Sequence, residues 1–182
     1  GAARAVLHGH LSLVRGLCFS PDGQRLASTS YDKTVRLWQL GLPVQERPLR
    51  GHQGGIEGLA YSPTGQHIAT GSQDRTVRLW DPATGAVLRV LLGHEGNIGN
   101  VAFSKDGARV ASAGNDGSAR IWDVHSGAEL QRLTVGKDRV CAVAFSPDGA
   151  ALATGLGDGS VRLWELATAT VRFHHQAHPS DC

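Results

Sequence analysis

The stretch SPTGQHIATGSQDRTVRLWD, at residues 62–81, decides the fold because the chain contains four versions of it. A shift of the sequence by 42 residues, without a gap, places each copy on the next. This shift superposes four tryptophans, Trp38, Trp80, Trp122 and Trp164, and four aspartates, Asp32, Asp74, Asp116 and Asp158. A fixed period of about 20–50 residues is typical of repeat architectures. We therefore expect each copy to form one structural unit.

The composition is that of a globular protein, with 182 residues of which 41% are hydrophobic and 19% charged. No apolar run approaches the roughly 18 residues that cross a bilayer, and the N-terminal GAARAVLHGH is too mixed for a signal peptide. The formal net charge is +2 and no block of like charge occurs, so neither nucleic acid nor a membrane is expected as a partner. The sequence has no methionine, which favours an excised piece of a longer protein.

The three cysteines show no spacing typical of a metal site or a disulfide. Cys18 stands where the other copies have alanine, at Ala60, Ala102 and Ala144. We therefore expect a small buried side chain at this position. Without disulfides, a reducing compartment is favoured, and the cytoplasm is the expected location.

One period predicts four short strands. In the second copy these are IEGLAY at 56–61, HIATGS at 67–72, TVRLW at 76–80 and AVLRVLL at 86–92, separated by turns rich in Pro, Gly and Asp. The two central strands carry apolar residues on both faces, so each sheet needs a neighbour on either side. Radial stacking of the sheets meets that need.

These motifs resemble the WD-repeat β-propeller family. A GH pair is followed some 28 residues later by WD, with PDG and an S-x-D-x-T-V-R-L-W run between them. The resemblance covers the chain as a single domain, 1–182, with repeats at 10–51, 52–93, 94–135 and 136–177. It implies an all-β fold in which four-stranded antiparallel sheets form the blades of a propeller. Residues 1–9 would supply a spare outer strand, of the kind that usually pairs with the last sheet in this family, and residues 178–182 would begin a further repeat.

Each copy also carries a histidine, a hydroxyl residue and an aspartate, the residue types of a hydrolase triad. The hydroxyl is selected by comparison, since the residue four before each aspartate is always Ser or Thr. The resemblance implies that these residues form a buried structural tetrad with the tryptophan. The complete tetrads are His10, Ser28, Asp32 and Trp38; His52, Thr70, Asp74 and Trp80; and His94, Ser112, Asp116 and Trp122.

A structural role for the tetrads is expected over acyl-transfer catalysis. An unpaired buried polar group costs about 1–3 kcal/mol, so four such groups that satisfy one another act as a clip. A nucleophilic site would need neither a tryptophan donor nor three copies.

The fourth copy departs from the pattern, because Gly136 stands where the others have histidine. Thr154, Asp158 and Trp164 then form an incomplete tetrad. We expect Asp158 to be more exposed or water-bonded, and this sheet to be the least stable of the four. The alternative is a sheet whose edge is normally supported elsewhere.

Two further sets of residues have side chains that can bind a ligand, a metal ion in one case and an anion in the other. His174, His175 and His178 have metal-ligand side chains, but adjacent strand residues point to opposite faces, so no metal site is expected there. Arginine recurs next to the tryptophans, at Arg36, Arg78, Arg120 and Arg162. This recurrence predicts stems packed between sheets, with heads near a neighbour's carboxylate, rather than an anion site.

Positions that differ between copies are the candidates for recognition. The residue before each aspartate varies, as do the two residues that enter the first strand, such as Gly55 and Glu57 in the second copy. In the family these positions lie on the rim most often used to bind peptides and proteins. We define the variable rim as Leu13, Arg15, Tyr31, Gln73, Asn97, Asn115 and Arg139. A Tyr beside a Leu and an Arg is typical of interface anchors, and ordinary loop variation is the alternative.

Four such sheets would form an open arc with two apolar ends, since rings in the family have around seven. Two arcs could close as a homodimer of eight blades, or missing repeats of a longer chain could close the ring. The function expected is a non-catalytic protein-interaction scaffold that binds a protein or peptide and has no cofactor. A sensor propeller of a larger signalling protein is the alternative, and a propeller enzyme or metal-binding domain is a further one.

Overall fold

The computed structural model describes residues 6–41 and 43–176, and every regular element in it is a β-strand. The first sheet contains β1 (Val14–Phe19), β2 (Arg25–Ser30), β3 (Thr34–Gln39) and β4 (Gln45–Arg50). The second contains β5 (Ile56–Tyr61), β6 (Ile68–Ser72), β7 (Val77–Trp80) and β8 (Val87–Leu91). The third contains β9 (Ile98–Phe103), β10 (Arg109–Gly114), β11 (Ser118–Asp123) and β12 (Glu129–Thr134). The fourth contains β13 (Val140–Phe145), β14 (Ala151–Leu156), β15 (Ser160–Glu165) and β16 (Thr170–Gln176).

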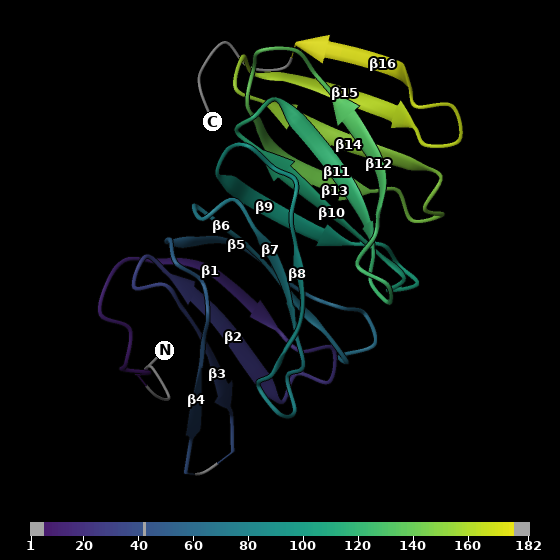
Figure 1. The fold of residues 1–182 in the computed structure, drawn as a ribbon. Helices are drawn as coiled ribbons and strands as arrows, with labels where there is room; N and C mark the ends of the chain where they lie inside the picture. The colour runs from purple at the N-terminus through teal and green to yellow at the C-terminus, as the bar shows by residue number, and fades with distance from the viewer. Residues whose placement is uncertain (1–5, 42, 177–182) are drawn as a thin grey trace, which may run out of the picture.

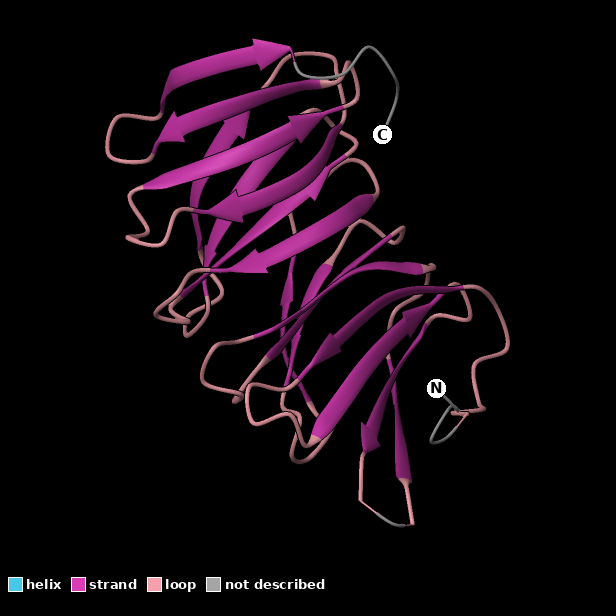
Figure 2. Cartoon of the chain, turned by 180° about the vertical axis from the view of Figure 1, so that it is seen from behind, coloured by secondary structure: helices cyan, strands magenta, loops and turns pink. Residues whose placement is uncertain are grey.

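Within each sheet the strands follow one another in chain order and pair antiparallel, which confirms the predicted fold class. The four sheets lie side by side along an arc, with the first sheet at one end and the fourth at the other (Figure 1). Seen from behind, the drawn elements are again strands joined by loops (Figure 2). Among the described residues, no helix exists that could cross a membrane.

The turn after each first strand explains why a glycine recurs there in all four copies. Ser20 accepts a hydrogen bond at its Oγ from the backbone N–H of Arg25 at 2.9 Å, and its own hydroxyl donates to Asp22. Gly23 has a φ of 68°, a left-handed conformation that costs glycine little and other residues more. The matching glycines have nearly the same φ: Gly65, Gly107 and Gly149. The chain therefore reverses in the same way in all four sheets.

Each sheet has a leading face, which points toward the preceding sheet, and a trailing face, which points toward the following sheet. The three junctions between neighbouring sheets are formed by these faces. The trailing face of the first sheet supplies Ala27, Val35, Leu37 and Leu49 to a core that the second sheet completes with Ile56, Ile68 and Trp80. The second junction uses the matching positions, Ala69, Val77, Leu79 and Leu91 with Ile98, Val110 and Trp122. The third uses Ala111, Ala119, Ile121 and Leu133 with Val140, Leu152 and Trp164. The same positions thus build all three junctions.

The two ends of the arc carry the same positions without a neighbouring sheet. On the leading face of the first sheet, Val14 is 43% exposed, whereas its counterparts Ile56 and Ile98 are fully buried. On the trailing face of the fourth sheet, Val161 is 39% exposed, whereas its counterpart Val35 is fully buried. The sheets therefore form an open arc and not a closed ring.

Three expectations concern the ends of the chain and its cysteines, and their outcomes differ. Residues 6–10 form no strand in this single chain, and β16 pairs with the outer edge of β15, so the spare outer strand predicted at residues 1–9 stays a prediction. Residues 1–5 and the predicted start of a further repeat at 178–182 lie outside the described residues. Cys141 is disulfide-bonded, so the prediction of no disulfide was wrong. Sequence spacing does not show which residues folding brings together, and the cysteines give no support to a reducing compartment.

Candidate functional site

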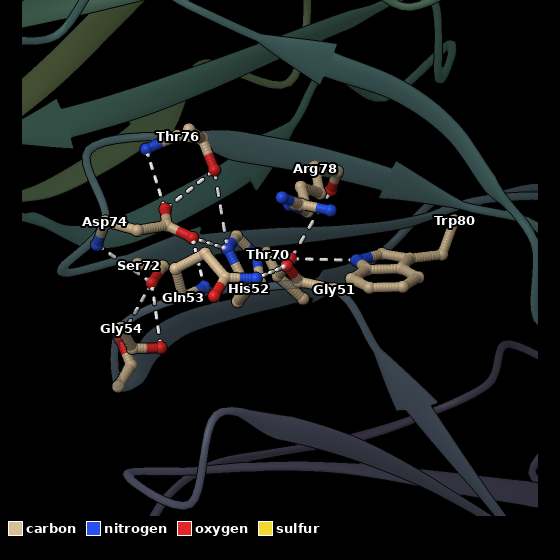
Figure 3. A network of polar contacts seen from close by, with 11 residues as sticks. Gly51, His52, Gln53, Gly54, Thr70, Ser72, Asp74, Thr76, Arg78 and Trp80 are labelled. Atoms are coloured by element: carbon tan, nitrogen blue, oxygen red, sulfur yellow. Dashed lines mark hydrogen bonds and ion pairs between the residues drawn. The ribbon is translucent and has the colours of Figure 1, made fainter.

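The second sheet shows how the chain assembles a polar tetrad (Figure 3). His52 lies in the loop before β5, Thr70 on β6, Asp74 in the turn after β6, and Trp80 at the end of β7. The Nδ1 atom of His52 lies 2.7 Å from Oδ2 of Asp74, and its Nε2 lies 2.8 Å from Oγ1 of Thr70. The indole N–H of Trp80 donates to the same Oγ1 at 2.8 Å. Four residues from one loop, one turn and two strands are thereby joined.

The direction of these hydrogen bonds follows from the chemistry of the groups. An indole N–H is a donor only, so Oγ1 of Thr70 accepts from Trp80 and keeps its own proton to donate. That proton goes to Nε2 of His52, which must carry a lone pair, so the imidazole proton lies on Nδ1 and is donated to Asp74. The tetrad is therefore a one-way chain of donors ending on a carboxylate, with a neutral histidine.

The first and third sheets repeat this arrangement. His10 lies 2.8 Å from Asp32 and 2.7 Å from Ser28, whose Oγ accepts from Trp38 at 2.9 Å. In the third sheet, the corresponding distances for His94, Asp116, Ser112 and Trp122 are 2.8, 2.8 and 2.9 Å. The structure thus brings together the residues of all three complete tetrads.

Sequence comparison missed a fifth member of each tetrad. The hydroxyl groups of Thr34, Thr76 and Ser118 donate to the tetrad aspartates at 2.6, 2.7 and 2.7 Å. The backbone N–H of the residue after each histidine also donates to the aspartate, at 2.9 Å from Gln53 in the second sheet. The signal was available, since a Ser or Thr stands two residues after the aspartate in all four copies.

His52, His94 and the aspartates of the three complete tetrads have pKa values below their usual ranges. Burial lowers the pKa of His52 and of His94, and it outweighs the paired aspartate, which favours the protonated ring. Burial alone would raise the pKa of Asp116, but hydrogen bonds from Ser118, the backbone of Glu95 and His94 outweigh it and lower the pKa to about 2. For Asp74, the same balance of burial against hydrogen bonds also lowers the pKa. Neutral histidine and ionised aspartate agree with the donor chain.

The geometry resembles a hydrolase triad, but the hydroxyl has no access to a substrate. Thr70 and Ser112 are fully buried, and the oxygen that would attack already accepts the indole N–H. Three surface hollows, with volumes of about 310, 170 and 430 Å³, surround Arg25 between the first and second sheets. Their linings contain no tetrad residue. The tetrads are therefore built to hold strands and loops together.

The fourth sheet keeps only part of the tetrad. Trp164 still donates its indole N–H to Thr154, at 3.1 Å. Asp158 accepts from the backbone N–H of Ser160 at 2.8 Å and is exposed, as expected, whereas the other three aspartates are half-buried. Gly136 has a φ of 113°, a conformation that side chains rarely adopt. The loss of histidine thus accompanies a different path of the loop that precedes β13.

The recurrent arginines pair differently from the prediction. Arg36 forms an ion pair with Glu46, and Arg120 pairs with Glu129 at 2.6 Å. Both glutamates lie on the outer strand of the arginine's own sheet, so the expected neighbour's carboxylate is wrong for these two. Arg162 instead donates to the backbone oxygen of Val135 at 2.9 Å.

These arginines explain the glycine of each Gly-His pair. A Cβ atom at Gly9, Gly51 or Gly93 would collide with the guanidinium of the arginine in the same sheet. The fourth sheet has Val135 at the corresponding position, and there the arginine bonds the backbone oxygen. In the first three sheets the glycine of this pair thus lies against the arginine, while the histidine belongs to the tetrad.

The variable rim lies at one end of each sheet. In each copy the residue before the aspartate donates its backbone N–H to the residue that precedes the first strand. These bonds are Tyr31 to Leu13 at 3.0 Å, Gln73 to Gly55 at 2.9 Å, Asn115 to Asn97 at 2.8 Å, and Gly157 to Arg139 at 3.0 Å. Positions that differ most between copies thus sit side by side in the structure.

The first and second sheets also connect the rim across their junction. The guanidinium of Arg15 lies over the ring of Tyr31, 5.4 Å from its centroid. The hydroxyl of Tyr31 donates to Oε1 of Glu57 at 3.3 Å, and Nε2 of Gln73 donates to the same oxygen at 2.8 Å. Glu57 is one of the varying positions at the start of the first strands, although the variable rim as defined does not include it. Within the described part of the chain, no three His, Cys, Asp or Glu side chains gather as a metal-ligand set.

Stacked four-stranded sheets, each tied by a histidine, hydroxyl, aspartate and tryptophan, define a repeat protein with propeller-type blades. The chain belongs to the WD40 family, described as WD domain, G-beta repeat, which matches residues 1–39, 43–81, 85–123 and 127–165. This family is generally a non-enzymatic interaction fold.

Curated relatives match single stretches of the chain. The human protein Striatin-4 is 64% identical over 33 residues, which cover 18% of this chain and 4% of that protein. The mouse Periodic tryptophan protein 2 homolog is 60% identical over 35 residues, 19% of this chain and 4% of that protein. The DDB1- and CUL4-associated factor 13 of Dictyostelium discoideum is 45% identical over 40 residues, 22% of this chain and 9% of that protein. The chain thus matches less than a tenth of the length of each of these relatives.

Proposed function

We propose that this chain is a non-catalytic scaffold that binds a protein or peptide partner at the variable rim. The observation that carries the proposal is the division of its polar residues into two sets. Those that recur in phase bond one another within the tetrads, whereas those that vary are gathered at one end of the sheets. One relative is named as an associated factor of other proteins, which is compatible with this role.

Binding at the rim can be tested with peptides from a random display library selected on the immobilised chain. The selected peptides are then measured on a rim variant, Leu13→Ser with Arg139→Ser, and on a control, Gln66→Ser with Lys105→Ser. Both pairs are exposed and change the net charge equally, but the control residues lie in turns at the opposite end of the sheets. We expect at least about ten-fold weaker binding to the rim variant only, as for loss of interface anchors. Equal binding to both variants, or no selected peptide, would contradict the proposal.

The second part of the proposal is that two copies join through their ends into a ring of eight sheets. Support comes from the free leading face of the first sheet, where Leu17 is 66% and Phe19 is 63% exposed. These positions match Leu59 and Tyr61, which pack against the core of the first junction. A second copy would offer this face Ala153 and Val161, the counterparts of Ala27 and Val35.

Sedimentation equilibrium decides between a homodimer and closure by other repeats. We expect twice the chain mass of 19.2 kDa for the wild type and a monomer for Leu17→Glu. The matched control is Leu88→Glu, at an exposed position on the outer strand β8. A folded monomer at all concentrations would overturn this part and would leave further repeats of a longer chain as the means of closure.

A further inference from the structure

Glu57 is held in place by two neutral donors that come from different sheets. Tyr31, after β2 of the first sheet, and Gln73, after β6 of the second, both donate to its Oε1 atom. Two donors on one oxygen fix the carboxylate and leave Oε2 to point elsewhere. The carboxylate is thus oriented before any partner arrives, which lowers the entropic cost of binding to it.

The third sheet places a glycine beside the second oxygen of Glu57. The position that matches Glu57 there is Gly99, and a Cβ atom built on it would lie 3.7 Å from Oε2. A longer side chain at this position would pack over the carboxylate. Gly55 likewise keeps the space beside Tyr31 free, since a Cβ there would meet the tyrosine ring.

Tyr31 contacts both a rim cation and Glu57, at different parts of its side chain. The guanidinium of Arg15 is stacked on the ring face of Tyr31, whereas Glu57 is bonded to the hydroxyl at the ring's far end. Among the described residues, Arg36, Arg120 and Arg172 form ion pairs with other acidic side chains and not with Glu57. The carboxylate of Glu57 therefore has no arginine of this chain as a counter-ion among the described residues.

We propose that Oε2 of Glu57 binds a lysine or arginine side chain of the partner polypeptide. This inference rests on the proposed function, because it names the chemistry that the variable rim selects. A charged acceptor with a cationic donor forms one of the stronger hydrogen bonds, and Tyr31 and Gln73 already meet part of the acceptor's needs. Arg15, stacked on the ring face of Tyr31, favours a partner in which an acidic residue follows or precedes the basic one.

The test uses random peptides of about 12 residues displayed on phage and selected on the wild-type chain. We expect a lysine or arginine at one shared position of the selected peptides. Each peptide and its variant with glutamine at that position are measured on the wild type, on Glu57→Gln and on the control Glu95→Gln. Glu95 is an exposed acid of the third repeat that follows His94, so the control loses the same charge at the same end of the sheets. Glu57→Gln keeps a carbonyl oxygen for Tyr31 and Gln73, and an unchanged melting temperature verifies the fold.

The expected result is at least about ten-fold weaker binding of the basic peptide to Glu57→Gln, with no change on Glu95→Gln. The glutamine peptide should bind the wild type and Glu57→Gln equally. Selected peptides without a shared basic residue, or equal binding to wild type and Glu57→Gln, would overturn the inference. The proposed function would survive that result as long as Leu13→Ser with Arg139→Ser still weakens binding, and if that variant also has no effect, both fail.

Discussion

The second and fourth sheets share strand order and pairing but differ in how their polar groups are satisfied. In the second, His52 links the loop before β5 to Thr70 and Asp74. In the fourth, the bond between tryptophan and threonine persists without a histidine, and Asp158 is an exposed residue. The comparison teaches that the tryptophan and threonine belong to the sheet itself, whereas the histidine fastens the incoming loop to it.

The largest difference in stability between the second and fourth sheets is expected when their aspartates are replaced. Asp74→Ala removes the acceptor of His52, Gln53 N–H and Thr76, and each stranded buried donor costs about 1–3 kcal/mol, so we expect a loss of about 3 kcal/mol. Asp158→Ala, at an exposed position, should cost less than about 1 kcal/mol. Urea unfolding followed by tryptophan fluorescence measures both. Equal losses would show that the two aspartates contribute equally to the free energy of unfolding and would contradict this prediction.

Lowering the pH should destabilise the sheets that contain His52 and His94 before it destabilises the fourth sheet, which has no tetrad histidine. The folded-state pKa of His52 and of His94 lies below that of the unfolded chain, about 6.5, so below that pH the unfolded chain binds more protons. Stability is therefore full above about pH 7 and falls as the pH drops, by up to about 1.4 kcal/mol per pH unit for each histidine. Urea unfolding at pH 7.5, 6 and 5 tests this, with His94→Gln expected to show a smaller slope. A slope that His94→Gln leaves unchanged would rule out His94 as a source.

Hydrogen exchange compares the sheets directly. Without a histidine clip, and with Val161 exposed on its trailing face, the fourth sheet is expected to exchange fastest. We expect amides of β14 to exchange about ten-fold faster than those of β6, which corresponds to about 1.4 kcal/mol of local stability. Mass spectrometry of peptides from the two strands measures the ratio, and equal protection would refute the expected order.

Restoring the histidine should not repair the fourth sheet. Gly136→His places a side chain at a φ of 113°, and strain of this kind costs about 1–3 kcal/mol. We expect the variant to be less stable than the wild type by about 1 kcal/mol in urea unfolding. Gly136→Ala is the control for backbone strain and should lose a similar amount. A more stable Gly136→His would mean that the loop can return to the path taken before His52.

The smallest effect is expected at Tyr61, whose hydroxyl is buried and has no hydrogen-bond partner among the described residues. Its counterparts in the next two sheets are Phe103 and Phe145. Tyr61→Phe should therefore leave stability unchanged or raise it by up to about 1 kcal/mol. Burial raises the pKa of this phenol to about 12, so titration of tyrosine absorbance gives a second readout of its surroundings. A clear loss of stability in urea would show that the hydroxyl is bonded after all.

Recurrence in the sequence predicts the contacts that recur in the structure. The strands, the stacking of sheets and the meeting of His52 with Thr70, Asp74 and Trp80 all repeat with the period, so comparison of the copies points to them. Contacts made only once leave no such signal. The carboxylate of Glu57 between two sheets and the disulfide of Cys141 are of this second kind.

Features that occur only once in the chain also explain the remaining differences between the sequence predictions and the structure. The backbone of Gly136 follows a path of its own, which one unmatched residue could not disclose. The predicted strand before the first repeat needs a free sheet edge, and in this single chain β16 pairs along the edge that the family resemblance assigned to it, so that strand stays a prediction. Availability of an edge depends on the whole chain and not on the local residues.

The identical use of positions at all three junctions has a consequence for how such a gene can change. An in-frame gain or loss of one 42-residue unit would leave every remaining junction with the same kinds of residues on its two faces. The angle swept by the arc would change, whereas the packing at each boundary would not. Duplication is therefore a mutation that this fold accepts more easily than most single substitutions in its core.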